Sequence, residues 1–284
     1  MTRQFYMRIF TRCTLAGSIL LCALATSAQE TSYDCVMEPR TTIELGSADE
    51  GILADLLIER GDIVKKGQPV ALLNDEEERL QVERARIRAE ADVDVRSKRA
   101  EAEFRLREED RIADLYATKL LPEKEYAQAK IERRLAELAV QSAETEFQVA
   151  KVDHRQAQER LARRSIKSPV NGVVVSVTMS PGEYVHKQAT VMTIAEIDPL
   201  NVEVFVPVDH YGTIAAGTEA EVMPEEPVGG VYTASVAVAD KVFDAASRTF
   251  GVRLILPNPK FELPAGVRCE VRFRSKTGPI SRTD

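Results

Sequence analysis

Short apolar runs separated by glycines fill residues 46–74 and predict a small unit of β-strands. Gly51, Gly61 and Gly67 divide the stretch GILADLLIERGDIVKKGQPVALL into runs that each suit one short strand. Glycine is typical of the tight turns between such strands. Three or four short strands have too little apolar surface to be stable alone, so a second segment is expected to complete the unit.

The completing segment lies at residues 165–198. When it is moved back by 121 positions, Gly172 and Gly182 fall on the first two glycines of the earlier segment without a gap. Gln188 falls on the third glycine, the one that is not repeated. A match at a fixed period identifies an internal repeat, so the two segments are expected to be halves of one β-domain.

Between these halves, residues 75–164 predict long helices. This stretch has no glycine, a single proline at Pro122 and 42 charged residues, a composition typical of solvated helices. After Pro122, alanine recurs at every seventh position, and a second row lies three residues before each alanine. Alternating steps of three and four predict a coiled-coil seam. The seam residues are Ala129, Ala136, Val140, Ala143, Phe147, Ala150 and Leu161.

The stretch before Pro122 supplies the partner of this seam. From Asp75 to Ala117 the pattern is less regular, with Leu80 and Ile87 among the expected seam positions. Only TKLLP separates the two arms, so we expect an antiparallel hairpin, with a free-standing long helix as the alternative. Pro122 suits the first helical position of the returning arm, where its missing N–H has no cost. Arms of about 43 residues give a hairpin roughly 65 Å long.

The rest of the chain is predicted to form β-strands. Residues 199–274 contain five runs that alternate apolar and polar residues between glycine and proline turns, a pattern that suggests a small barrel. Residues 29–45 also alternate and are expected to add a strand to that barrel. The predicted fold class is therefore α+β and elongated: a β-sandwich split by an antiparallel α-helical coiled-coil hairpin, followed by a small β-barrel.

The first 28 residues have the pattern of a secretory signal peptide. Three arginines precede an apolar run that is shorter than a membrane-spanning helix and ends in small residues. Cleavage is expected, with a retained anchor as the alternative, and residues 275–284 form a short tail. Removal of the leader changes the net charge from −7 to −10. An acidic exported chain without a basic stripe is not expected to bind nucleic acid.

Catalytic and cofactor chemistry finds no support in the pattern. His154, His186 and His210 are scattered over the hairpin, the second half-domain and the barrel, with no acidic residue at zinc spacing beside them. We expect no enzyme, no metal site and no cofactor. Cys35 and Cys269 remain after cleavage, and an oxidising compartment would permit them to pair. From the residues alone, a disulfide and two separate buried thiols both stay open.

Together these elements resemble the periplasmic adaptors of Gram-negative bacteria, the HlyD-like membrane fusion proteins of tripartite efflux systems. The resemblance rests on two lipoyl-like halves, GILADLLIERGDIVKKGQPVALL and NGVVVSVTMSPGEYVHKQATVMTI, that flank a heptad hairpin. It covers essentially all of the chain after the leader. Only ten residues follow Arg274, so the chain resembles short adaptors, and this feature leaves the transporter class open. The short form is similar to adaptors of resistance-nodulation-division (RND) pumps.

The resemblance implies a periplasmic subunit that bridges an inner-membrane transporter and an outer-membrane channel and packs into a ring, expected to be a hexamer. It implies channel contact at the hairpin tip through Arg111 and Leu115, with Thr118 and Pro122 beside them. Pro122 stands where the family pattern has a serine, so the contact of that serine is not carried over. The family's barrel also implies a disulfide between the strands of the two cysteines.

Three other functions share part of this pattern. An adaptor of an ABC-type exporter shares this architecture and differs in its transporter. A lipoyl or biotinyl carrier needs a lysine in an exposed turn between its halves, and here helices replace that turn. A structural coiled-coil spacer would need neither the lipoyl-like halves nor the barrel. Binding of a transporter and an outer-membrane channel separates an adaptor from the last two.

Overall fold

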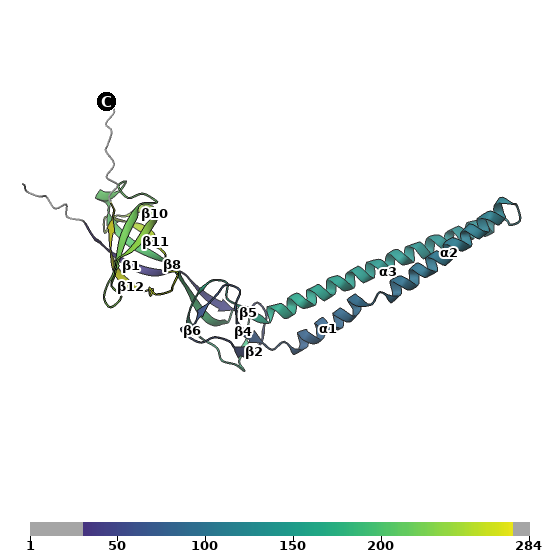
Figure 1. The fold of residues 1–284 in the computed structure, drawn as a ribbon, viewed down its shortest axis with the longest axis horizontal. Coiled ribbons are helices and arrows are strands. Elements are labelled where there is room, and N and C mark those ends of the chain that lie inside the picture. Colours follow the sequence, from purple (N-terminus) through teal and green to yellow (C-terminus); the bar gives the residue numbers. More distant parts are fainter. Residues whose placement is uncertain (1–30, 275–284) are drawn as a thin grey trace, which may run out of the picture.

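The structure is a computed structural model that describes residues 31–274. The expected signal peptide (1–28) and tail (275–284) lie outside the described residues. The chain is elongated, with a β-barrel at one end, a smaller β-sandwich in the middle and long helices extending from the sandwich (Figure 1). Among the described residues, no helix is both long and apolar enough to cross a membrane.

The sandwich is built from the two repeated segments. Its strands are β2 (Gly51–Leu56), β3 (Ile63–Val64), β4 (Pro69–Leu73), β5 (Ser165–Lys167), β6 (Gly172–Val177), β7 (Tyr184–Val185) and the first part of β8 (Thr190–Pro207). A shift of 121 residues carries β2 onto β6, β3 onto β7 and β4 onto the start of β8. The internal repeat read from the sequence is therefore also a repeat of strands.

The two halves interlock instead of lying side by side. β2 pairs with β7 and β3 pairs with β6, so each half lends a short strand to the other. The turn N–H of Gly61 donates to the carbonyl of Val174 at 2.9 Å, and the equivalent N–H of Gly182 donates to Leu53 at 2.8 Å. Both halves contribute to one buried core. This exchange explains why neither half is expected to fold alone.

Gln188 occupies a turn position that glycine suits better. Its φ is +71°, close to the +82° of Gly67 at the equivalent position. A residue with a side chain costs about 1 kcal/mol in this left-handed region. Glycine avoids that cost, but it loses more backbone entropy on folding, which offsets part of the gain. We expect Gln188→Gly to raise the free energy of unfolding by about 0.5–1 kcal/mol, measured by urea denaturation. The reverse change, Gly67→Gln, should lower it, and equal effects of the two changes would contradict this explanation.

The barrel has six strands and is closed by pairing between the first and the last strand of its sheet. Its strands are β1 (Tyr33–Gly46), β12 (Val267–Phe273), β9 (Glu219–Pro224), β10 (Tyr232–Asp244), β11 (Thr249–Leu256) and β8, in that order, and β1 pairs with β8 to complete the circle. A short 3-10 turn, Val208–His210, follows β8. Apolar residues that alternate along these strands fill one core, with Phe250 its largest fully buried side chain.

Two long strands join the barrel to the sandwich. β1 pairs with β8 from Cys35 through Gly46, with register shifts between Pro39 and Thr41 and between Leu45 and Gly46. β8 therefore runs through the predicted domain boundary at residues 198 and 199, and β1 reaches beyond the barrel that it was expected to join. A continuous two-stranded ribbon satisfies its own backbone hydrogen bonds, so no loop is needed between the two cores.

The inserted segment forms three helices. α1 (Glu76–Glu90) and α2 (Val93–Ala117) run away from the sandwich, and α3 (Glu123–Arg163) returns alongside both of them (Figure 1). α3 alone is roughly 60 Å long at 1.5 Å per residue. The helices leave and re-enter the sandwich between β4 and β5, which pair with each other.

The predicted alanine row lies on the protected side of α3. Ala129, Ala136, Ala143 and Ala157 are buried. The other predicted seam residues, Val140, Phe147, Ala150 and Leu161, are partly exposed. Small side chains in this row let α3 approach the outgoing helices closely.

The outgoing arm differs from the prediction. It is broken at Ala91 and Asp92 instead of being one helix, and Ala91 has an extended backbone. Leu80 and Ile87 were expected in the seam, but they are 72% and 58% exposed. Ala89 is buried in their place. Close approach to a row of alanines leaves room for another alanine but not for a leucine or isoleucine, which is the physical reason for the difference.

Candidate docking site at the hairpin tip

The candidate site is the turn that joins α2 to α3. It lies at the end of the hairpin that is farthest from the barrel (Figure 1). The end of α2, the residues TKLLP and the first turn of α3 form it. Arg111, Leu115, Thr118 and Pro122, the four residues predicted for this site, all belong to these elements.

Hydrogen bonds of the backbone give the tip a fixed shape. The N–H of Lys119 donates to the carbonyl of Tyr116 at 2.8 Å, and the N–H of Leu120 donates to Leu115 at 3.0 Å. Lys119 has a φ of +60°. This pair of bonds around a left-handed residue is the Schellman motif that ends many helices. The hydroxyl of Thr118 donates back to the Leu115 carbonyl at 2.9 Å, so its proton is used within its own helix.

Pro122 was expected at the first helical position of α3, but it is the residue just before that position. It is the N-cap of α3, with extended backbone (φ −70°, ψ 152°), and the helix begins at Glu123. The Pro122 carbonyl accepts the N–H of Glu125 at 3.1 Å. A proline here extends the preceding chain because its ring fixes φ near −65°. The two glutamates of the first turn face the positive end of the helix dipole, which favours the start of the helix.

Arg111 is held by a neighbour on its own helix. Its Nη2 and Nε donate to the two carboxylate oxygens of Glu108 at 2.5 and 3.2 Å. The hydrogen bond to Arg111 lowers the pKa of Glu108 below its usual value, and the same bond raises the pKa of Arg111. A lowered carboxyl pKa means that the pair is intact at neutral pH and is lost only as the pH falls through that pKa.

Leu115 lies one helical turn beyond Arg111, so the two side chains share a face of α2. Leu115 is partly buried, whereas the Arg111 side chain is 63% exposed. Just below the tip, the ring of Tyr116 stacks on that of Tyr126 with centroids 5.2 Å apart. The stacked rings tie the two arms together. The tip therefore presents a charged donor beside an apolar side chain on a rigid support, which suits contact with another protein.

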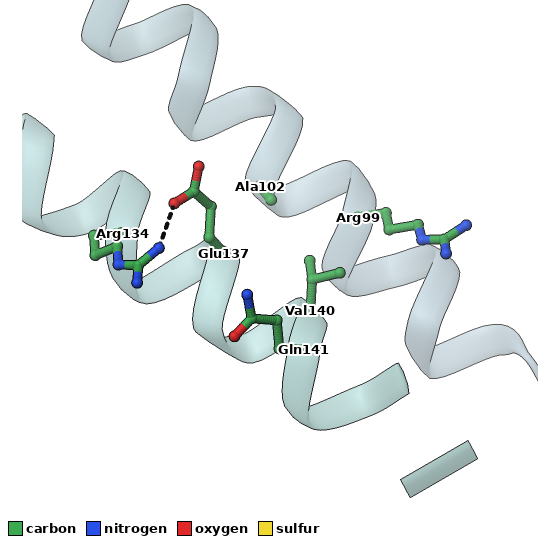
Figure 2. Close-up of a pocket in the computed structure, with 6 residues that line it drawn as sticks. All are labelled: Arg99, Ala102, Arg134, Glu137, Val140 and Gln141. Atoms are coloured by element: carbon green, nitrogen blue, oxygen red, sulfur yellow. Dashed lines mark hydrogen bonds and ion pairs between the residues drawn. The ribbon is translucent and has the colours of Figure 1, made fainter. Parts of the chain in front are cut away.

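A shallow groove lies midway along the hairpin, between α2 and α3. It has a volume of about 470 Å³ and is lined by Arg99, Ala102, Arg134, Glu137, Val140 and Gln141. Figure 2 shows the ion pair between Arg134 and Glu137 on α3, with Ala102 contributed by the facing helix. The groove is lined by Ala102 and Arg99 on α2 and by four residues on α3. It has no convergent set of polar groups and is not a candidate for catalysis.

Arg164 ties the base of the hairpin to the sandwich. Its guanidinium pairs with the buried carboxylate of Glu78 and donates through Nη1 to the carbonyl of Glu50 at 2.7 Å. Its own carbonyl accepts the N–H of Leu73 at 2.8 Å. One residue therefore connects α1 and the end of α3 with the end of β4 and the residue just before β2.

We expect Arg164→Met to lower the free energy of unfolding by about 2 kcal/mol, because it leaves the Glu78 carboxylate buried without its charged partner. Chemical denaturation followed by circular dichroism at 222 nm measures this change. Adding Glu78→Met should recover part of the loss, since both partners are then apolar. A double variant that is less stable than Arg164→Met would contradict the pairing.

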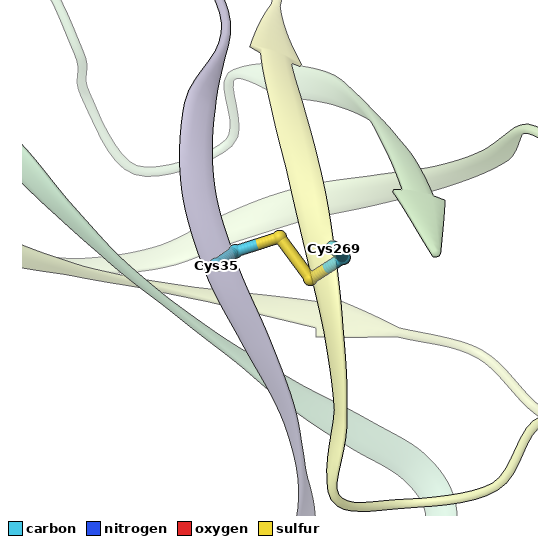
Figure 3. The surroundings of a disulfide bond; sticks show 2 residues. All are labelled: Cys35 and Cys269. Carbon is cyan, nitrogen blue, oxygen red and sulfur yellow. A yellow bond between two sulfur atoms is a disulfide. The ribbon is translucent and has the colours of Figure 1, made fainter. Parts of the chain in front are cut away.

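The two cysteines are joined across neighbouring barrel strands (Figure 3). Cys35 on β1 lies directly opposite Cys269 on β12, with their Cα atoms 4.9 Å apart and their sulfurs bonded. Both residues are buried in the barrel core. Of the two possibilities that the residues alone left open, the structure contains the disulfide.

The histidines do not gather into a site. His154 faces the seam with a buried Nε2 that has no hydrogen-bond partner, His186 lies beside Tyr184 in the sandwich, and His210 contacts Tyr33 at the barrel. In residues 31–274, no three histidine, cysteine or acidic side chains are grouped so that they could hold a metal ion.

Two features of this region were not recognised in the sequence. Lys119 follows the end of α2 in a left-handed conformation. The only signal for it in the sequence was the proline three residues later, which indicates that a helix ends nearby. Arg164 looked like one of twenty basic residues of the helical segment. A basic residue at the last turn of a helix was a weak signal, because its partner Glu78 is 86 residues away.

Comparison with known families agrees with this architecture. The CzcB-like barrel-sandwich hybrid domain matches residues 42–196, more than half of the chain. The CusB-like β-barrel domain of the RND type matches residues 200–277. The two matches meet within β8, the strand that joins the sandwich to the barrel.

Individual proteins also resemble this chain in sequence or in structure. The nickel-cobalt-cadmium resistance protein NccB of Alcaligenes xylosoxydans xylosoxydans is 26% identical over 209 residues, which cover 73% of this chain and 46% of NccB. This chain thus spans about half the length of that relative. Crystallised MacA of Actinobacillus actinomycetemcomitans has a TM-score of 0.71 at 18% identity, over 86% of this chain and 78% of MacA. The structure of a membrane fusion protein of Streptococcus pneumoniae has a TM-score of 0.58 at 14% identity, over 87% of this chain and 100% of that protein's chain.

The two structural relatives share the fold, and the two domain matches together cover the sandwich, the hairpin inserted in it and the barrel. The chain therefore belongs to the family of RND-type membrane fusion proteins.

Proposed function

We propose that this chain is the periplasmic subunit that bridges an RND-type inner-membrane transporter and an outer-membrane channel. The observation that carries the proposal is the linear order of its parts. A barrel of the CusB-like type stands at one end, and a rigid tip with an exposed donor and an apolar side chain stands at the other (Figure 1). The work of such a subunit is geometric: the hairpin sets the distance between two membrane proteins.

The proposal assigns a role to each part. The hairpin is a coiled coil closed by the alanine row, and its tip contacts the channel through Arg111 and Leu115. The sandwich supplies contacts between neighbouring copies in a ring, for which we propose six copies. The barrel lies toward the inner membrane, where the transporter binds. Export through a cleaved leader would place the chain in the periplasm, where the disulfide between Cys35 and Cys269 is favoured.

We further propose divalent metal cations as the cargo. The support is the relative whose name refers to resistance to nickel, cobalt and cadmium, which shares 26% of its residues with this chain over 209 positions. In this proposal the transporter selects the cation. The adaptor then needs to provide only the connection.

Copurification tests the bridge. The full-length chain, tagged at its C-terminus and expressed in its own host, should copurify from detergent-solubilised membranes with one RND transporter and one outer-membrane channel. A host without the transporter gene serves as the control, and the channel should still be recovered there through the tip. Recovery of neither protein would remove the adaptor assignment, and recovery of an ABC exporter would replace the transporter class.

The cargo needs a separate test. Deletion of the gene should lower tolerance to nickel, cobalt or cadmium in growth assays, and the intact gene should restore it. Loss of tolerance to organic drugs with unchanged metal tolerance would overturn the cargo and leave the bridge standing.

A further inference from the structure

Most arginines of the helical hairpin have an acidic partner, and a few do not. Fifteen arginines lie between residues 76 and 164. Eleven of them form an ion pair with a carboxylate. Within the described part of the chain, the four without an ion pair are Arg84, Arg88, Arg155 and Arg160. Three of these four, all except Arg155, line one cavity, so the unpaired positive charge of the hairpin is concentrated at one place.

The cavity lies between α1 and α3, in the part of the hairpin nearer the sandwich (Figure 1). Its volume is about 180 Å³. Pockets for drug-sized molecules measure roughly 300–1,000 Å³, so this one suits a small ion. Besides the three arginines, its lining consists of three alanines, two glutamines and one aspartate. Ala157 is buried, whereas the three arginines are exposed, so their guanidinium groups are accessible to a ligand from solvent.

The sequence gives these arginines no free acidic neighbour on their own helices. Residues three and four apart share a helix face, and at these distances neither Arg84 nor Arg160 has an aspartate or glutamate. Arg88 has Asp92 four residues later, but Asp92 pairs with Arg96. Arg84 and Arg88 are themselves four residues apart, a spacing at which like charges destabilise a helix. An anion from outside the chain would relieve this repulsion.

Arginine–carboxylate pairs join the two arms at other levels of the hairpin. Arg99 on α2 pairs with Glu144 on α3, and Arg164 pairs with Glu78 at the base. The cavity lies between these two pairs along the hairpin, and there both arms supply arginine. Its lining contains one carboxylate, that of Asp153, which forms no ion pair in residues 31–274. A bound anion would take the place that a glutamate has at the other levels.

We propose that this cavity binds a phosphate group, held by Arg84 and Arg88 from α1 and by Arg160 from α3. A guanidinium presents parallel N–H donors that match two oxygens of an oxyanion. The three arginines and Asp153 give the lining three positive charges and one negative charge, an excess of two positive charges. A phosphate dianion balances that excess, whereas a single carboxylate balances half of it.

The bound phosphate would link α1 to α3. α1 has 15 residues and is separated from α2 by the break at Ala91 and Asp92. A helix of this length is marginal in water without tertiary support. An anion held by both arms adds such support at the level where the chain itself supplies no ion pair. The inference concerns the base of the hairpin and does not depend on the proposed adaptor function.

Calorimetric titration with inorganic phosphate tests the site. The full-length chain is purified from its host in a buffer without phosphate or sulfate and titrated at about pH 8, where phosphate is mostly a dianion. We expect one phosphate per chain, with a dissociation constant of about 1 mM or lower. Sodium chloride at equal ionic strength should give no binding heat.

Single substitutions separate a site from general charge. Arg88→Gln and Arg160→Gln should each weaken phosphate binding about tenfold or more, because each removes a charged hydrogen-bond donor. The matched control is Arg155→Gln, which removes an unpaired arginine that does not line the cavity. It should change the affinity by less than about twofold, because salt screens a distant exposed charge. Equal weakening by Arg155→Gln and Arg88→Gln would overturn the proposal. Asp153→Asn should tighten binding severalfold, because it removes a carboxylate that repels the anion.

Hydrogen exchange locates the bound anion. Saturating phosphate should slow exchange of the backbone amides of α1 relative to chloride, and this protection should be absent in Arg88→Gln. Protection that appears only outside α1 and the facing part of α3 would overturn the proposal.

A second probe, glycerol 3-phosphate, distinguishes a free anion from a phosphate carried by a larger molecule such as a lipid head group. Binding of inorganic phosphate alone identifies the free anion, and equal or tighter binding of glycerol 3-phosphate identifies a phosphate ester. Either result supports the site, provided that Arg88→Gln weakens it. Binding of neither probe, with normal helix content by circular dichroism, contradicts the site. These measurements need neither transporter nor channel, so their outcome is separate from that of the adaptor assignment.

Discussion

Leu115→Asp should abolish efflux through this adaptor while leaving its fold intact. Leu115 lies on the face of α2 that carries Arg111, on a tip fixed by a Schellman motif and by stacked tyrosines. If this face meets a channel, the substitution places a carboxylate in an apolar contact without a partner. Burying an unpaired charge at an interface costs several kcal/mol, and about 4 kcal/mol weakens binding roughly 1,000-fold.

Arg111→Asp should have the same effect for a different reason. It removes the guanidinium and sets a second carboxylate beside Glu108, so the local charge is reversed. Both variants are measured by growth in the presence of the cargo and by recovery of the channel in copurification.

The matched control is Leu80→Asp. It makes the same change at a leucine of the same hairpin that is 72% exposed and lies near the base. This variant should keep both tolerance and channel recovery. Normal tolerance in Leu115→Asp and Arg111→Asp, at normal protein levels, would remove the tip from the docking site.

Cys35→Ala combined with Cys269→Ala should lower the free energy of unfolding by about 2–4 kcal/mol. The disulfide spans a sequence separation of 234 residues and joins the first barrel strand to the last. Without it, the unfolded chain gains the freedom of that whole loop, and β1 loses its covalent tie to the strand beside it.

Guanidinium denaturation of the purified protein measures the change. A reductant should destabilise the natural protein to a similar extent and should have no effect on the double variant. Equal stability of the natural protein with and without reductant, after mass spectrometry has verified reduction, would show that the bond contributes nothing to folding.

Much of the fold was predictable because its elements follow periodic patterns in the sequence. The period of 121 residues located both halves of the sandwich, and it relates β2, β3 and β4 to β6, β7 and the start of β8. The alanine row on α3 was read from steps of three and four, and four of its members are buried. Alternation likewise located the strands of the barrel. Each of these signals depends only on which side of a local element faces the core.

The errors occurred where the answer depends on a distant partner. The outgoing arm is broken at Ala91 and Asp92, and Leu80 is exposed where a seam residue was expected. The outgoing arm has apolar residues in more than one row, and its own sequence does not say which row meets the alanines. Pro122 was displaced by one position, a typical error for the end of a helix.

The sequence by itself determined the order and type of the elements, the interrupted repeat and the helical segment in place of a carrier's lysine turn, because these are properties of local pattern. Only the tertiary structure decided that the halves exchange strands and that Cys35 meets Cys269. Each of these depends on register between segments far apart in the chain, and register is fixed by packing rather than by local preference.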